Sequence, residues 1–76
     1  MKSQLQDALD KVTVSLVMKL NYGEELALNE HYTIYHYCSE DVIVISDEEE
    51  EVLQVMVNGL NLEYEVLDES RVNDEL

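Results

Sequence analysis

The chain has 76 residues, of which 46% are apolar, and its 18 acidic residues against four basic ones give a formal net charge of −14. This length has room for one domain, and the apolar fraction is too high for a disordered chain. The negative charge argues against direct binding to nucleic acid or to an anionic membrane surface, and no apolar run reaches the roughly 18 residues of a membrane-spanning helix.

The acidic residues are concentrated in the later part of the chain. Residues 1–20 hold three lysines and two aspartates, whereas residues 21–76 hold one arginine and sixteen acids. Cys38 is the only cysteine, so no internal disulfide is expected. The first residues lack the apolar core of a signal peptide. These features predict a protein of the reducing cytoplasm.

The first predicted element is a helix over about residues 3–20. Ser3 and Gln6 form a capping box, and apolar residues from Leu5 to Leu20 recur at helical spacing. An alternative remains open, because residues 12–20 also alternate between apolar and polar and are rich in β-branched side chains. In that alternative a short helix ends at about Lys11 and a mostly β fold follows. Residues 21–30 contain a turn near Gly23 and no clear element.

Four strands are predicted after residue 30. Residues 31–38 are rich in aromatic and β-branched side chains, residues 42–46 are almost wholly apolar, and residues 51–57 and 60–67 flank Asn58-Gly59. This dipeptide is the preferred centre of a two-residue hairpin turn, which would place Val57 opposite Leu60. The prediction is therefore a single α+β domain over residues 1–67, with the helix packed on a four-stranded antiparallel meander. Residues 68–76 are predicted to be a frayed acidic tail.

The acidic run from Asp47 to Glu51 has two interpretations. Ser46 and Glu49 would form a capping box for a helix over residues 47–58. The alternation of Leu53, Val55 and Val57 favours instead an acidic hairpin loop that leads into a strand.

The strand pattern also predicts which side chains face the helix. A tight connection between the first two strands places Tyr35 opposite Val44, and the helix would then pack on the face with Tyr35, Tyr37, Val42, Val44, Leu53, Val55, Val57, Leu60, Leu62 and Tyr64. The opposite face would hold Ile34, Ile43, Ile45, Val52 and Met56. If residues 21–30 do not cover it, this second face is an apolar patch that would favour a homodimer or another partner.

The residues that most often carry chemistry form no recognisable site. His31 has the opposite strand parity to His36 and Cys38, and no CxxC pair is present, so no metal site is predicted. The serine and threonine residues lie in no catalytic frame, and no glycine-rich phosphate loop occurs. We therefore expect a protein that is not an enzyme and that holds no cofactor.

The acidic residues are the remaining candidates for function. Glu63 and Glu65 would project from the same face of one strand, about 6.6 Å apart at a rise of about 3.3 Å per residue. A row of carboxylates on a rigid sheet imitates the charges of a nucleic-acid backbone, and it would attract a basic protein. The predicted partner-binding residues are Glu40, Asp41, Asp47, Glu48, Glu49, Glu50, Glu51, Glu63, Glu65, Asp68 and Glu69.

In length, charge, lone cysteine and the acidic stretches Asp47 to Glu51 and Glu63 to Glu69, the chain resembles the small acidic inhibitors encoded by bacteriophages. These include anti-CRISPR proteins, anti-restriction proteins and uracil-DNA glycosylase inhibitors. The resemblance implies a protein that occupies the DNA or RNA site of a target enzyme in the host cytoplasm, with a CRISPR effector as the first candidate. It further implies aromatic anchors at Tyr32, Tyr35, Tyr37 or Tyr64.

Two other functions fit the same pattern. The first is an immunity or antitoxin-like protein that caps a basic nuclease. The second is a structural protein that oligomerises through an apolar sheet face and uses its charge for solubility.

Overall fold

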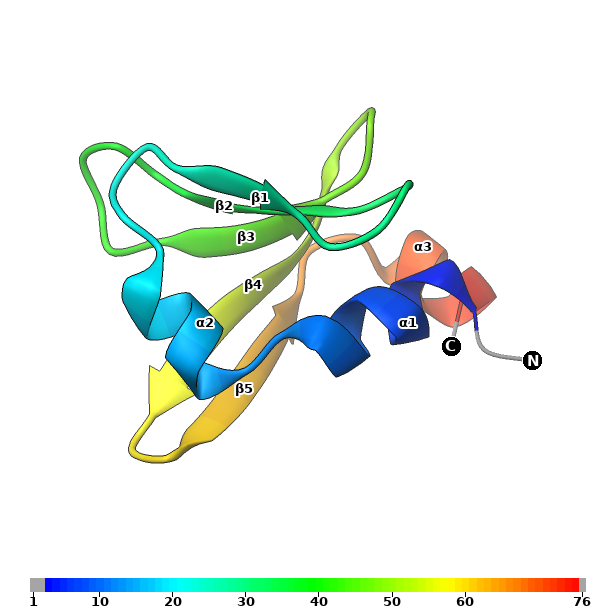
Figure 1. Ribbon diagram of the computed structural model, residues 1–76. Helices are drawn as coiled ribbons and strands as arrows, with labels where there is room; N and C mark the ends of the chain where they lie inside the picture. Colours follow the sequence, from blue (N-terminus) through cyan, green and yellow to red (C-terminus); the bar gives the residue numbers. More distant parts are fainter. Residues whose placement is uncertain (1–2, 76) are drawn as a thin grey trace.

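The computed structural model describes residues 3–75, which form an α+β fold with three helices and one five-stranded antiparallel sheet (Figure 1). The strands follow one another across the sheet in chain order, so each pairs with its neighbour in sequence. The elements are α1 (Gln4–Lys11), α2 (Val14–Lys19), β1 (Glu25–Ala27), β2 (Thr33–His36), β3 (Ile43–Ser46), β4 (Glu51–Asn58), β5 (Asn61–Val66) and α3 (Glu69–Glu75). The predicted fold class is confirmed, with five strands in place of four.

The predicted helix over residues 3–20 is divided into α1 and α2. The predicted cap at Ser3 is present, since its hydroxyl accepts a hydrogen bond from the backbone N–H of Gln6 at 3.1 Å. The chain leaves the helix at Val12, where ψ is 123° and the side chain is buried. The Thr13 hydroxyl then accepts from the backbone N–H of Leu16 at 3.1 Å and caps α2. The alternative correctly ended the first helix at Lys11, but a second helix follows it and not a strand.

The strand that was not predicted, β1, is short and lies at the edge of the sheet. It pairs Glu25 with Tyr35 and Ala27 with Thr33. The turn before it places Gly23 at a φ of 79°, a backbone conformation that favours glycine. All three residues of β1 are exposed. Because an exposed edge strand needs no apolar alternation, its sequence shows none.

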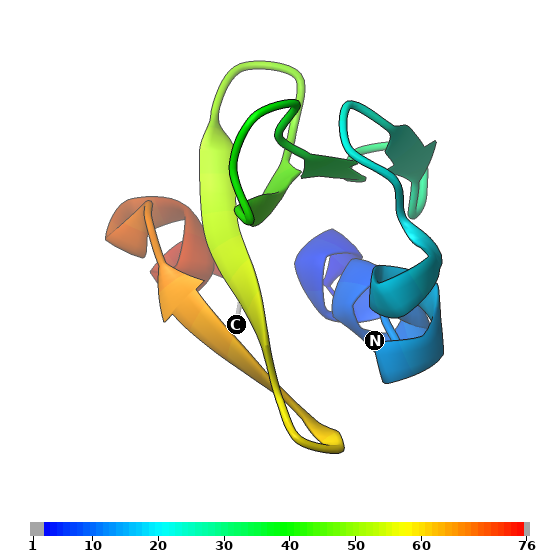
Figure 2. The same cartoon turned by 90° about the vertical axis from the view of Figure 1, so that its left-hand side faces the viewer.

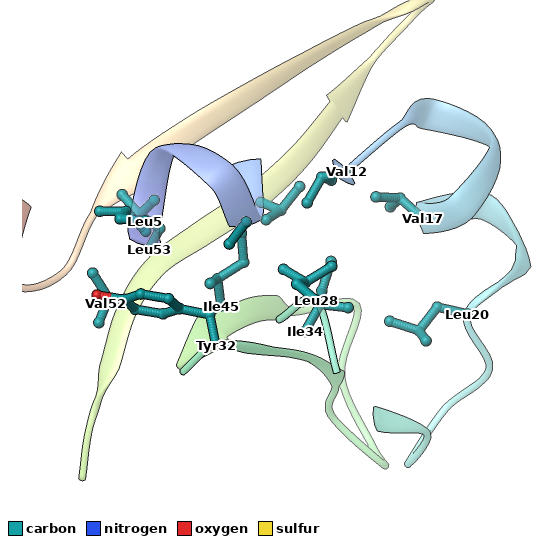
Figure 3. Close-up of a cluster of buried hydrophobic side chains, with 12 residues drawn as sticks. Leu5, Val12, Val17, Leu20, Leu28, Tyr32, Ile34, Ile45, Val52 and Leu53 are labelled. Atoms are coloured by element: carbon teal, nitrogen blue, oxygen red, sulfur yellow. The ribbon is translucent and has the colours of Figure 1, made fainter. Parts of the chain in front are cut away.

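The core lies between the two N-terminal helices and the concave face of the sheet. The sheet bends around α1 and α2 (Figure 2). Leu5, Val12 and Val17 from the helical segment meet Ile34 and Ile45 from the strands (Figure 3). Full burial of each such aliphatic side chain contributes about 1.5–3 kcal/mol, so this cluster is the main stabilising feature of a small domain.

A β-bulge decides which sheet face meets the helices. Between β3 and β4, Ile45 pairs with Leu53 while Ser46 pairs with Glu51, which leaves Val52 as an extra residue. The kink buries both Val52 and Leu53, at 0% and 3% exposure. Because Ile45 pairs with Leu53 and with Ile34, these two isoleucines belong to the core and not to the second face predicted for them.

The predicted helix-facing set is therefore wrong for β2 and β3. Tyr35 does pair with Val44, as predicted, but Val44 pairs with Gln54 and shares its face. The predicted apolar patch on the second face is also absent from the described residues, because Ile34, Ile45 and Val52 are fully buried. The packing argument for a homodimer was based on that patch.

The β4–β5 hairpin forms with a register one residue later than predicted. Asn58 pairs with Asn61 and Val57 pairs with Leu62, so Gly59 and Leu60 are the central turn residues. Gly59 has a φ of 65° and no other residue near it has a positive φ, which is the type II′ pattern. Because the turn lies one residue later, each residue of β4 pairs with the β5 residue two positions beyond the predicted partner. A shift of two residues preserves the alternation of faces, so each side chain keeps the face predicted for it. The acidic loop before β4 is confirmed over the helix that competed for residues 47–58.

The predicted frayed tail is wrong over residues 69–75, which form α3. The Asp68 side chain accepts from the backbone N–H of Arg71 at 3.2 Å and caps the helix. Val72 packs against the core, and α3 contacts α1 and β4. Leu76 lies outside the described residues. Among the helices of residues 3–75, none is long and apolar enough to cross a membrane.

Candidate partner-binding surface

The face of the sheet that points away from α1 and α2, here called the outer face, is defined by Tyr35, Tyr37, Val44, Gln54, Met56, Glu63 and Glu65. The strand pairing places Tyr35, Val44, Gln54 and Glu65 in one row across four strands. The rings of Tyr35 and Tyr37 lie 5.7 Å apart at 52°. The outer face therefore has an aromatic pair at the end of β2 and a pair of carboxylates on β5.

Both carboxylates of the outer face are exposed to solvent. Glu63 pairs with Met56 and Glu65 pairs with Gln54 across the β4–β5 hairpin. The amide of Asn58 donates to Glu63 at 3.3 Å. As predicted, Glu63 and Glu65 project from the same face of one strand. The antiparallel pairing of the hairpin fixes the spacing between them.

Asp47 has a different role from the one predicted. Its side chain is only 9% exposed, and its Oδ1 accepts hydrogen bonds from the backbone N–H groups of Glu49 and Glu50, each at 2.8 Å. Its Oδ2 accepts from the guanidinium of Arg71 in α3. Asp47 therefore shapes the β3–β4 loop and anchors the C-terminal helix, and its carboxylate is not available to a partner.

Three more predicted contact residues have internal partners. Asp41 accepts from the Tyr22 hydroxyl at 2.5 Å, Glu51 accepts from the Tyr37 hydroxyl, and Asp68 caps α3. The hydrogen bond to Asp41 raises the pKa of Tyr22, because ionising the phenol would place two negative charges side by side. The bond to Glu51 raises the pKa of Tyr37 in the same way.

Glu50 and Asp68 meet between the β3–β4 loop and the start of α3. The interaction between these two side chains raises the pKa of Glu50 and lowers that of Asp68. Hydrogen bonds from the backbone N–H groups at the start of α3 also lower the pKa of Asp68. Glu50 also lies 3.7 Å from the guanidinium of Arg71. At this end of the molecule, the single arginine therefore interacts with both Asp47 and Glu50.

The other six predicted acids are exposed and accept neither from Arg71 nor from a tyrosine hydroxyl: Glu40, Glu48, Glu49, Glu63, Glu65 and Glu69. Lysine and arginine are absent from all five strands. Lys11 lies 3.3 Å from Asp7 on the same helix, and Lys19 is on α2. The positive charges of residues 3–75 are therefore confined to the helices.

Two features of this surface were not predicted from the sequence. Tyr35 and Tyr37 were predicted to face the helix, yet they lie on the outer face. The burial of His36, at 9% exposure, was not predicted. Its parity with Ile34 is the signal that would have found it, once Ile34 was placed in the core. Within residues 3–75, no three histidine, cysteine or acidic side chains are arranged to hold a metal ion.

The structure defines a class of protein: a small acidic α+β domain in which an open five-stranded meander bends around an N-terminal helix pair. Comparisons with protein-family models, with curated protein sequences and with solved structures gave no match.

Proposed function

We propose that this chain is a nucleic-acid mimic that binds a basic nucleic-acid-binding enzyme and occludes its DNA or RNA site. The observation that carries the proposal is the pattern of charge on the sheet. Glu48, Glu49, Glu63 and Glu65 are exposed on the β3–β4 loop and on the outer face, and the five strands contain no lysine or arginine.

The physical basis is the pairing of carboxylates with the cationic groups that normally bind phosphates. Glu63 and Glu65 are two residues apart on one strand, which separates their Cα atoms by about 6.6 Å. Arginine forms bidentate, charge-assisted hydrogen bonds with carboxylate as it does with phosphate. A net charge of −14 also speeds the encounter with a basic surface, and salt weakens this attraction.

The outer-face tyrosines support the same function. Tyr35 and Tyr37 are partly exposed on the same outer face as Glu63 and Glu65, and strands β3 and β4 lie between the two pairs. Guanidinium groups stack favourably on tyrosine rings, and tyrosine is enriched at protein interfaces. A CRISPR effector in the cytoplasm of an infected cell is the target that the resemblance to phage inhibitors suggests.

The experiment combines capture with displacement. The tagged full-length chain is incubated with a bacterial lysate at low ionic strength, and captured proteins are identified by mass spectrometry. We expect a nucleic-acid-binding enzyme that is released by salt, is displaced by its own DNA or RNA, and is inhibited by the purified chain at equal molar ratio. Capture of proteins that nucleic acid does not displace would contradict the proposal.

A matched pair of variants tests the surface itself. The first carries glutamine at Glu48, Glu49, Glu63 and Glu65. The second neutralises four exposed acids elsewhere, Asp10, Glu24, Glu30 and Asp74, and so has the same net charge. We expect the first variant to bind its target at least about a hundredfold more weakly, and the second to retain most of the affinity. Equal binding by both folded variants would show that the outer face is not the contact.

A further inference from the structure

A hollow of about 460 Å³ lies between α2 and the concave side of strands β2–β4. Its walls are apolar and include Val17 and Met18 from α2 and Val55 and Val57 from β4. Two polar side chains, His36 and Asp41, also line it. It lies on the other side of the sheet from the glutamates of the outer face.

His36 lines this hollow and has one buried ring nitrogen without a hydrogen-bond partner among the described residues. Its Nδ1 lies 3.0 Å from the carbonyl oxygen of Leu20. Because a carbonyl oxygen only accepts, Nδ1 carries the proton, and the Nε2 of the neutral ring is then a hydrogen-bond acceptor. The ring is more than nine-tenths buried, and Nε2 has no hydrogen-bond partner among the described residues. A buried acceptor of this kind calls for a donor.

Asp41 supplies a second acceptor at the rim. Its Oδ1 accepts from the Tyr22 hydroxyl at 2.5 Å, and its Oδ2 has acceptor capacity for another donor. The ring of Tyr22 lies 4.4 Å from that of His36, so Tyr22 contacts both polar groups. The hollow therefore combines apolar walls with a carboxylate at its rim and a buried imidazole, and Tyr22 contacts both.

We infer that this hollow receives an arginine side chain from a basic partner protein. The aliphatic part of the arginine contacts Val17, Val55 and Val57, and its guanidinium donates to Asp41 and to Nε2 of His36. A purely apolar ligand would leave Nε2 without a donor, and an anion would be repelled by Asp41. A guanidinium has five donors in a rigid fork and is weakly hydrated, so it serves two acceptors at once in a partly apolar site. The inference rests on the proposed function only in that a basic partner supplies the arginine.

The test uses small probes and no partner protein. N-acetyl-arginine amide is titrated into the full-length chain and followed by NMR at the His36 ring nitrogens and at the backbone amides of Val17, Val55 and Val57. N-acetyl-citrulline amide, which has nearly the same shape and no charge, is the control probe. We expect saturable shifts with arginine, including a shift of the unprotonated Nε2, and binding about tenfold weaker with citrulline.

Two exposed neighbours provide matched variants. Asp41→Asn and Glu40→Gln each remove one charge from the same turn, and only Asp41 lines the hollow. We expect Asp41→Asn to weaken arginine binding about tenfold and Glu40→Gln to leave it within about twofold. Equal effects of the two variants, shifts that do not saturate, shifts confined to exposed acids, or a proton found on Nε2 in the free protein would each overturn the inference.

The outcome is independent of the test of the proposed function. If the arginine probe does not bind but glutamine at Glu48, Glu49, Glu63 and Glu65 abolishes inhibition, mimicry by these acids stands and the hollow has no part in it. If the probe binds and no nucleic-acid enzyme is captured, the hollow remains an arginine site and the proposed function fails.

Discussion

At the scale of single residues, Asp47 is a carboxylate that is bound by groups of its own chain and is therefore not available to a partner. It accepts two backbone N–H groups of the β3–β4 loop and the guanidinium of Arg71. Its neighbour Glu48 is exposed and has the same formal charge. Of these two adjacent acids, Asp47 stabilises the fold and Glu48 is solvated. Substitutions can distinguish the two roles.

We expect Asp47→Asn to lower the free energy of unfolding by about 1–3 kcal/mol, because it weakens a largely buried charge-assisted network. Glu48→Gln, which removes the same charge, should leave stability unchanged or slightly higher through reduced repulsion. Urea unfolding of the two variants measures the difference. If Asp47→Asn were as stable as Glu48→Gln, the loop would not depend on this contact.

At the scale of elements, α3 is held by its cap and by the packing of Val72. Its first turn begins at Asp68, whose side chain bonds the backbone N–H of Arg71. Its last turn contains no basic residue and does contain Asp74, so the end of the helix dipole is not compensated there. Removing the acid at the start of α3 should therefore destabilise the helix, whereas removing the acid in its last turn should not.

We expect Asp68→Ala to destabilise α3 by about 0.5–2 kcal/mol and to accelerate hydrogen exchange of its amides. Asp74→Ala removes the same charge, and exchange in α3 should stay equal or become slower. Amides of β3 and β4 are the internal reference, since the core does not depend on the cap. Faster exchange in both variants would point to net charge and not to capping.

At the scale of the whole molecule, the fold raises the pKa values of the tyrosine side chains. Hydrogen bonds to Asp41, Cys38 and Glu51 raise the pKa values of Tyr22, Tyr35 and Tyr37 respectively, and burial raises those of Tyr32 and Tyr64. All five tyrosines of the chain are therefore harder to ionise in the folded state than in the unfolded chain.

This shift predicts a loss of stability at alkaline pH. A raised folded-state pKa contributes stability that is complete below the unfolded value of about 10 and is lost as the pH rises through the folded value. We expect phenolate absorbance to titrate at higher pH in the native protein than in denaturant, and urea midpoints to fall over the same range. Glu51→Gln should return the pKa of Tyr37 toward its usual value. A native titration at or below the denatured one would contradict the prediction.

The candidate surface was only partly predictable from the sequence. Exposed acids such as Glu48 and Glu65 follow from composition, because carboxylates without partners stay in water. The internal use of Asp41 and Asp47 does not, since their partners Tyr22 and Arg71 are 19 and 24 residues away in the chain. The hollow beside His36 was not predictable for the same reason. It exists only where α2 meets three strands.

The sequence by itself determined the α+β class, the position of four strands and the negative charge of the sheet, because strand periodicity and solvation are local properties. Only the tertiary structure decided which face of β2 and β3 meets the helices. One extra residue in the β-bulge at Val52 reverses the parity between neighbouring strands, and burial of both Val52 and Leu53 stabilises that arrangement. Likewise α3 is held by contacts with distant residues, because Asp47 accepts from Arg71 and the core packs against Val72, and no local pattern of residues 68–76 reveals these contacts.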